Sequence, residues 1–162
     1  MGPEIAMSWD AAAKYAPLVT ATMAVLAFLG AIVSIWIQRR AAQKRAAIDF
    51  FLKTEMDEKM VEAHRKYRCA AAALKKTSDL AAFAQTDDGV SIRSYLNVHE
   101  LLAVGVNQRV FHNSVSRAFW TAELERACND CRNLLAYLKV EPAEKMTYVE
   151  MVKLNRKWQS RS

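Results

Sequence analysis

A long apolar segment without charge dominates the hydrophobic pattern of the first part of the chain. Between Lys14 and Arg39 no side chain carries a charge. A helix needs roughly 20 apolar residues to cross a bilayer, whereas a long helix of a soluble protein carries charges on its solvent face. A cleaved signal fits less well, because its apolar stretch is shorter, about 7–15 residues, and follows a basic start. The pattern therefore predicts a transmembrane helix over residues 16–38.

The residues on either side of this segment predict its orientation. Glu4 and Asp10 precede it, and four basic residues follow it, namely Arg39, Arg40, Lys44 and Arg45. Lys and Arg are retained on the cytoplasmic side of a membrane, which predicts that the C-terminal side of the span lies in the cytoplasm. The same four side chains are expected to contact anionic lipid headgroups.

This topology divides the chain into four parts. We expect a short extracytoplasmic N-terminus over residues 1–15, the span over 16–38, a basic juxtamembrane helix over 39–56 and a cytoplasmic helical domain over 57–162. The expected topology is a single pass with the N-terminus outside.

Small side chains recur along the predicted span at alternating spacings of four and three. They are Thr20, Ala24, Ala27, Ala31 and Ser34. A stripe of small residues allows two helix backbones to approach closely, which predicts a transmembrane seam in a homo-oligomer. The alternative interpretation is that alanine is simply common in this chain.

Helical spacing of apolar residues continues after the span, and no alternation of period two is long enough for a sheet. Ile48, Phe51, Leu52 and Met56 form one stripe, which predicts that the helix leaving the membrane faces a core. A long helix is expected over about residues 113–138, ended by Glu141-Pro142. The predicted fold is all-α, with one N-terminal transmembrane helix that continues into a cytoplasmic bundle of four to five helices.

Capping signals predict where individual helices begin. TEMD at residues 54–57 indicates a possible break in the first helix. Asp87-Asp88-Gly89 predicts a turn. Ser91 is the expected N-cap of the helix that follows this turn. TYVE at residues 147–150 has the S/T-x-x-E form of a capping box and predicts the last helix.

One motif in the chain resembles that of a known family. The segment RSYLNVHELLAVGV, with the pattern R-x-Y-L-N-x-x-E-x-L-A-x-G-V, is similar to a signature of short bacterial and prophage proteins that carry a domain of unknown function. The resemblance covers roughly residues 36–160. It implies one N-terminal span, a basic linker and a closing helix that bears tryptophan. It also implies a location in a bacterial inner membrane and a bacterial or prophage-related setting such as phage defence. It implies no activity.

The polar residues of this motif share one helix face. Arg93, Asn97 and Glu100 are spaced by four and three, so neighbouring members can touch. One interpretation is a polar cluster that fixes how helices pack. The other is a notch that binds a partner or a small ligand. The first interpretation is favoured, because hydrogen-bonded networks commonly fix packing.

Candidate chemistry in the rest of the chain is sparse. His99-Glu100 lacks the second histidine of the H-E-x-x-H zinc motif. Cys128 and Cys131 form a lone C-x-x-C inside a predicted helix, and the odd count of three cysteines indicates a reducing compartment rather than disulfides. Four glycines spread over the chain do not form a phosphate loop. We therefore expect no cofactor, no metal and no enzymatic activity.

These features support three functional hypotheses. The first is a non-enzymatic single-pass membrane protein whose helical domain binds itself or another membrane or cytoplasmic protein. The second is an oligomeric membrane-permeabilising or channel-like protein assembled through the small-residue stripe. The third is a membrane-tethered enzyme or nucleic-acid binder, although the net charge of +6 is not gathered with aromatic residues into a patch, so no nucleic acid is expected.

Overall fold

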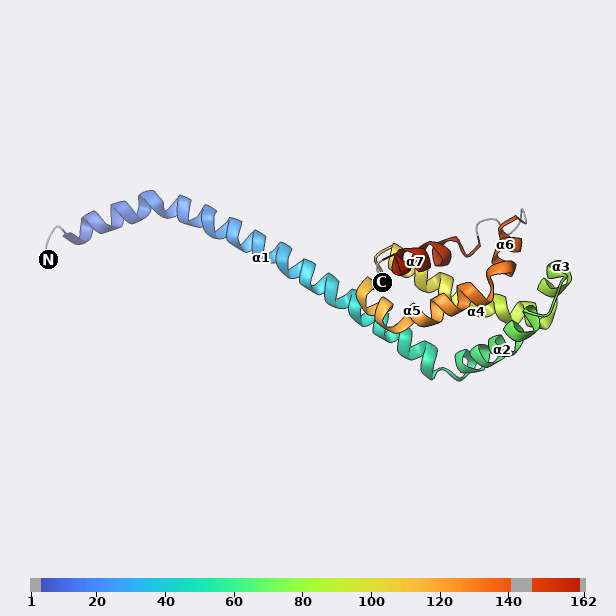
Figure 1. The fold of residues 1–162 in the computed structure, drawn as a ribbon. Helices are drawn as coiled ribbons and strands as arrows, with labels where there is room; N and C mark the ends of the chain where they lie inside the picture. The colour runs from blue at the N-terminus through green and yellow to red at the C-terminus, as the bar shows by residue number, and fades with distance from the viewer. Residues whose placement is uncertain (1–3, 141–146, 161–162) are drawn as a thin grey trace. The chain divides into compact units, whose positions relative to one another are not determined.

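The structure is a computed structural model that describes residues 4–140 and 147–160, with side chains from residue 14 onward. Every regular element in these ranges is a helix, as predicted (Figure 1). The helices are α1 (Glu4–Met56), α2 (Glu58–Leu74), α3 (Leu80–Ala84), α4 (Asp87–Asn107), α5 (Asn113–Asp130), α6 (Arg132–Val140) and α7 (Val149–Gln159). The expected stop at Glu141-Pro142 lies outside the described residues.

The chain forms two compact units, Met1–Ala42 and Gln43–Ser162. In the first unit, the side chains of residues 14–42 are all exposed, although most of them are apolar. Within the described residues, α1 is the one helix that is long and apolar enough to cross a membrane. The second unit contains the last residues of α1 and the six helices that follow it.

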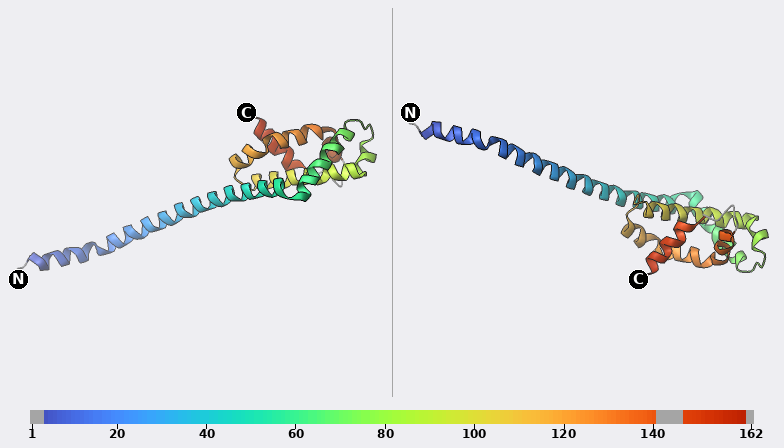
Figure 2. Two further views of the ribbon diagram at one scale, coloured as in Figure 1. Left: turned by 90° about the horizontal axis from the view of Figure 1, so that it is seen from below. Right: turned by 90° about the horizontal axis from the view of Figure 1, so that it is seen from above.

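Helix α4 is central to the second unit. It packs against α2, α7, α3 and α5, and Figure 2 shows this arrangement from two further sides. Its buried face consists mainly of apolar side chains at helical spacing, which explains its position in the core. The largest fully buried side chains come from α2, α4, α5, α6 and α7: Tyr67, Ile92, Leu96, Leu102, Leu124, Leu134, Met151, Leu154 and Trp158.

The break between α1 and α2 lies close to its predicted position. Asp57 is the N-cap of α2, and its Oδ1 accepts hydrogen bonds from the backbone N–H groups of Lys59 at 3.0 Å and Met60 at 3.3 Å. Thr54 does not cap the helix. Its hydroxyl instead donates to the carbonyl of Phe51 at 2.7 Å, within the last turns of α1.

The apolar stripe predicted for the end of α1 is wrong in part. Phe51 packs against the core, but Ile48, Leu52 and Met56 are exposed. The side chains that face the core instead are Ala47, which is buried, and Phe50, which packs against the core. This part of α1 carries apolar residues on two opposite sides, so periodicity alone did not identify the side that faces the core.

Helix α4 begins five residues before the predicted start. Its N-cap is Thr86, whose Oγ1 accepts a hydrogen bond from the N–H of Gly89 at 3.2 Å, and Ser91 lies inside the helix. The sequence Asp87-Asp88-Gly89 is therefore the first turn of α4. A Cβ atom at Gly89 would collide with the carbonyl oxygen of Phe83, so glycine permits the close approach of α3.

The predicted helix over residues 113–138 is two helices, because the chain bends at the fully buried Cys131 between α5 and α6. This bend and the short α3 raise the number of helices after α1 to six within the described residues, compared with the expected four or five. Helix α7 begins at Val149 with Tyr148 as its N-cap, one residue later than the capping box predicted.

Candidate functional site

The three polar residues of the motif lie on the side of α4 that meets the end of α3 and the start of α7. The guanidinium of Arg93 donates to the carbonyl of Ala84 at 3.0 Å. The amide oxygen of Asn97 accepts from the hydroxyl of Tyr148 at 3.1 Å. Glu100 accepts from the backbone of α7. Each of the three side chains therefore contacts a neighbouring segment of the same domain.

Glu100 supplies the cap that α7 lacks. Tyr148 has a φ of 63° and makes no side-chain cap to the helix that follows it. The Glu100 carboxylate accepts hydrogen bonds from the N–H groups of Met151 at 2.7 Å and Glu150 at 3.2 Å. A carboxylate is also favoured near the positive end of a helix dipole. The contacts of this face are those of a packing cluster, and a partner-binding role for it stays a prediction.

The other residues predicted from the sequence lie in α1. The stripe of Thr20, Ala24, Ala27, Ala31 and Ser34 is exposed along the first unit. The polar members of this region bond within the helix, since Thr20 donates to the carbonyl of Ala16 at 2.9 Å and Gln38 donates to Ser34 at 3.3 Å.

The four basic residues divide between the two units. Arg39 and Arg40 belong to the first unit, where the Arg40 guanidinium lies 4.8 Å from the ring centre of Trp36. Lys44 and Arg45 belong to the second unit and are exposed. All four side chains are therefore accessible to lipid headgroups or to a partner.

The second unit also contains a cavity that the sequence did not predict. It has a volume of about 350 Å³ and lies among the end of α1, α2, α4 and α5. Its residues come from four helices, so no local motif marks it. Aromatic and polar side chains in its lining include His64, Arg68, Tyr95, His99, Trp120 and Glu123.

Aromatic rings form one wall of this cavity. The ring of Tyr95 stacks on that of Tyr67 with 3.9 Å between centres. His99 lies 4.5 Å from Tyr95, and its ring meets Trp120 edge to face at 5.5 Å. Such aromatic pairs contribute beyond their buried area and fix the positions of α2, α4 and α5.

His99 is fully buried and neutral near pH 7. Burial lowers its pKa to about 4, although the Tyr95 carbonyl opposes this shift. Nδ1 lies 3.1 Å from that carbonyl, which only accepts, so Nδ1 carries the proton. Within the described residues, His99 Nε2 and Trp120 Nε1 have no hydrogen-bond partner. The cavity wall thus contains one unused acceptor and one unused donor.

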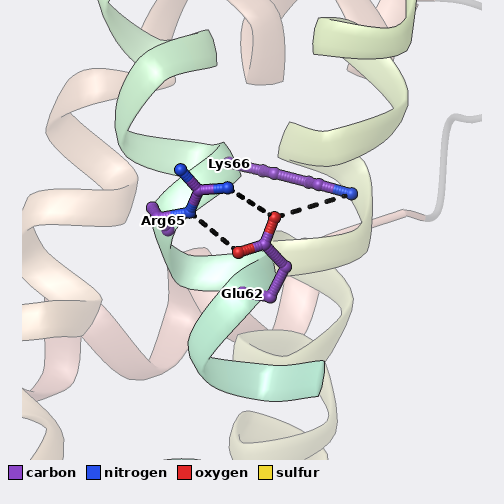
Figure 3. Close-up of polar contacts among 3 residues, drawn as sticks. All are labelled: Glu62, Arg65 and Lys66. Atoms are coloured by element: carbon purple, nitrogen blue, oxygen red, sulfur yellow. Dashed lines mark hydrogen bonds and ion pairs between the residues drawn. The ribbon is translucent and has the colours of Figure 1, made fainter. Parts of the chain in front are cut away.

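The acidic residues of α2 form a solvated face. Figure 3 shows the Glu62 carboxylate held by Arg65 and Lys66. Arg65 binds it through two hydrogen bonds, of 2.8 Å from Nε and 2.9 Å from a terminal nitrogen. The hydrogen bond from Arg65 lowers the pKa of Glu62, and the same bond raises the pKa of Arg65. Both side chains are exposed at i,i+3 spacing, an arrangement typical of a helix surface.

The C-x-x-C pair has no feature of a reactive site. Burial raises the pKa of the Cys131 thiol to about 12 and that of Cys128 to about 11. Thiols with raised pKa values are poor nucleophiles and poor metal ligands near neutral pH. In residues 4–140 and 147–160, no group of three or more His, Cys, Asp or Glu side chains is placed to hold a metal ion.

Comparison with known proteins identifies a family without an assigned activity. No curated protein and no solved structure matches the chain. The family model described as a domain of unknown function (DUF4760) matches residues 21–158, which include part of the apolar segment and nearly all of the helical domain. The predicted membership in a family with a domain of unknown function is confirmed, and the chain belongs to the DUF4760 family.

Proposed function

We propose that this protein is a non-enzymatic, single-pass protein of a bacterial inner membrane, and that its cytoplasmic helical domain mediates self-assembly or binds another protein. One observation carries the proposal. An uncharged segment with exposed apolar side chains precedes a compact helical unit that has its own core.

The energetics of the apolar segment favour insertion into lipid. The exposed side chains of residues 16–38 include many large apolar ones, such as Leu18, Phe28 and Ile35. Transfer of each such side chain out of water is favourable by about 1.5–3 kcal/mol. The segment lies within one continuous helix, so its backbone N–H and C=O groups are hydrogen-bonded to each other, as a membrane span requires.

The charge pattern supports a cytoplasmic location for the domain. Arg39, Arg40, Lys44 and Arg45 follow the span, and acidic residues precede it. This asymmetry is that of a span with its C-terminal side inside. The four basic side chains lie where they contact anionic headgroups in such an orientation.

A binding role for the domain is supported by what its polar residues do. Arg93, Asn97 and Glu100 contribute hydrogen bonds to packing. A partner would therefore bind elsewhere on the domain, and large apolar side chains are exposed on several of its helices. A permeabilising role has less support, since the Thr20 and Thr22 hydroxyls bond to carbonyls of their own helix. Leakage of small ions from vesicles that contain the protein would favour that role instead.

Membrane extraction and thiol labelling test the proposal with the native chain. Cys69 is exposed on α2, whereas Cys131 is buried. We expect the chain to resist alkaline carbonate, and an impermeant maleimide to label Cys69 in inverted membrane vesicles but not in intact spheroplasts. Cys69→Ser measures the background from Cys128. Cys69→Ser combined with Ser8→Cys is expected to give the opposite labelling.

Two results would contradict the proposal. Release of the chain from membranes by alkaline carbonate would show that residues 16–38 do not anchor it in the bilayer. Labelling of Cys69 from outside intact spheroplasts would reverse the orientation.

A further inference from the structure

The end of α1 in the second unit is apolar on two opposite sides. On its inner side, Ala47 is buried and Phe50 packs against the core. On its outer side, Ile48 is 40% exposed, Leu52 is 45% exposed and Met56 is 76% exposed. One apolar stripe suffices to hold a helix on its own core, so the second, exposed stripe is available to another helix.

The outer side follows the spacing of the small-residue stripe. The alternation of four and three that begins at Thr20 passes Ser34 and continues along the sequence through Gln38, Ala41, Arg45, Ile48 and Leu52. This is the a/d repeat of a coiled coil, with Ile48 at a d position and Leu52 at an a position. Ala47 and Phe50, which face the core, fall at c and f, away from the seam, whereas Phe51 falls at g and borders it.

Charges beside the repeat fit a parallel copy of the same helix. Lys44 occupies a g position and Asp49 the following e position, five residues later. In a parallel, in-register pair of helices, g of one chain lies opposite that e of the other. Both side chains are exposed, and neither forms an ion pair within the described part of the chain. A two-fold pair of chains would therefore form two such ion pairs.

Arg45 distinguishes this surface from a purely apolar one. It occupies an a position, where a single basic residue disfavours higher assemblies and fixes register at some cost in stability. Asp49 lies four residues later on the same helix, at the spacing of a favourable ion pair, and it offsets part of the like-charge repulsion between two Arg45 side chains.

We propose that a second copy of this chain, in the same membrane orientation, packs along the outer side of residues 45–52. The two helices would form a parallel two-stranded coiled coil whose repeat also includes the stripe from Thr20 to Ser34. This inference rests on the proposed function, because the shared membrane orientation is what makes the pairing parallel.

Disulfide cross-linking of the full chain in isolated membranes tests the pairing. The background carries Cys69→Ser and Cys128→Ala and retains the buried Cys131. Ile48→Cys and Leu52→Cys are expected to form linked dimers on mild oxidation. The matched control is Lys53→Cys, an exposed b position beside Leu52, which is expected to remain monomeric.

The same comparison applies within the span. Ala27→Cys, at a d position of the repeat, is expected to cross-link. Ile32→Cys, at a b position, is expected not to.

Exchange of the two charges provides a second readout. Lys44→Glu and Asp49→Lys each place like charges across the seam, so each is expected to lower cross-linking of the Leu52→Cys variant by about two- to fivefold. The double exchange reverses both partners of each pair and is expected to restore the yield. Additive losses in the double exchange would overturn the parallel g-to-e pairing.

The remaining outcomes separate this inference from the membrane anchor. A carbonate-resistant chain that gives no dimer at Ile48→Cys and Leu52→Cys overturns the seam and leaves the anchor in place. Equal cross-linking of Lys53→Cys overturns it as well, since collision or another face would then explain the dimers. Release of the chain by carbonate contradicts the proposed membrane anchor, and it also contradicts the parallel pairing, which depends on that anchor.

Discussion

The carboxylate of Glu100 in α4 accepts a hydrogen bond from the backbone N–H of Met151 in α7, with 2.7 Å between Oε2 and N. The two residues are 51 positions apart in the sequence. An acidic side chain of one helix thus serves as the N-terminal cap of another. This contact couples the formation of α7 to the presence of α4.

Replacement of Glu100 by alanine should lower the free energy of unfolding by about 1–2 kcal/mol, because two N–H groups at the start of α7 lose their acceptor. Urea unfolding of the full chain in detergent, followed by tryptophan fluorescence, measures this change. Glu55→Ala is the matched control, since Glu55 is exposed and should change stability by less than about 0.5 kcal/mol. Equal effects of the two substitutions would show that the cap contributes nothing.

Alanine at position 89 should destabilise the domain, although alanine in place of glycine normally favours a helix by up to about 1 kcal/mol. The added methyl would overlap the Phe83 carbonyl oxygen and the backbone of Ala84, neither of which can rotate away. We expect a net loss of about 1–3 kcal/mol in unfolding free energy. Ser94→Ala, at an exposed position of the same helix, should be nearly neutral in the same urea titration. A stabilised Gly89→Ala variant would contradict the close packing of α3 on α4.

Buried His99 should make the domain less stable in mild acid. Burial lowers its pKa to about 4 in the folded state, from an ordinary value near 6.5 in the unfolded chain. Between these two values the unfolded state binds more protons, so stability is complete above pH 6.5 and falls as the pH drops toward 4. The total loss attributable to His99 is on the order of 3 kcal/mol.

Urea midpoints measured between pH 7.5 and pH 4 test this assignment. His99→Gln should remove most of the slope in that range, whereas His64→Gln should retain it because His99 is still present. An unchanged slope in His99→Gln would place the responsible group elsewhere.

The three cysteines should differ widely in reactivity toward a thiol reagent at pH 7.5. Cys69 is exposed and should react within the folded chain. Cys131 is buried with a pKa raised to about 12, so it should react only after unfolding in urea. Mass spectrometry of the labelled peptides, with and without urea, gives the order directly. Rapid labelling of Cys131 in the folded chain would indicate that the α5–α6 bend opens.

Local patterns in the sequence were sufficient for the helical class and for some helix boundaries. The break before α2 lies at Asp57, inside the predicted TEMD segment, because its cap bonds only to residues two and three positions ahead. The start of α4 was missed because Gly89 reads as a turn residue. Its conformation in the structure is helical, and its role is to admit the backbone of Phe83, which the local pattern does not encode.

Longer-range relationships were beyond the local pattern. The face of Arg93, Asn97 and Glu100 follows from helical spacing, but its partners Ala84, Tyr148 and Met151 belong to other segments. The cavity near His99 likewise draws its lining from four helices, so no single stretch of sequence marks it.

The prediction of which side of α1 faces the core was wrong in part, and the reason differs from those above. Both the inner and the outer side of its last turns carry apolar residues, so periodicity gave two equivalent answers. Contacts from residues far along the chain distinguish the buried side from the exposed one, since the ring of Phe50 lies 5.1 Å from Phe111 and 5.8 Å from Trp120.

The dependence of α7 on α4 has a consequence for the order of events during translation. Helix α7 is synthesised after the other described helices, and it contributes Met151, Leu154 and Trp158 to the interior. Since domains generally fold as units, the nascent chain exposes the polar face of α4 and an incomplete interior until α7 emerges. A message truncated before residue 149 would therefore yield a chain that stays open to cellular proteases, even where its apolar segment is intact.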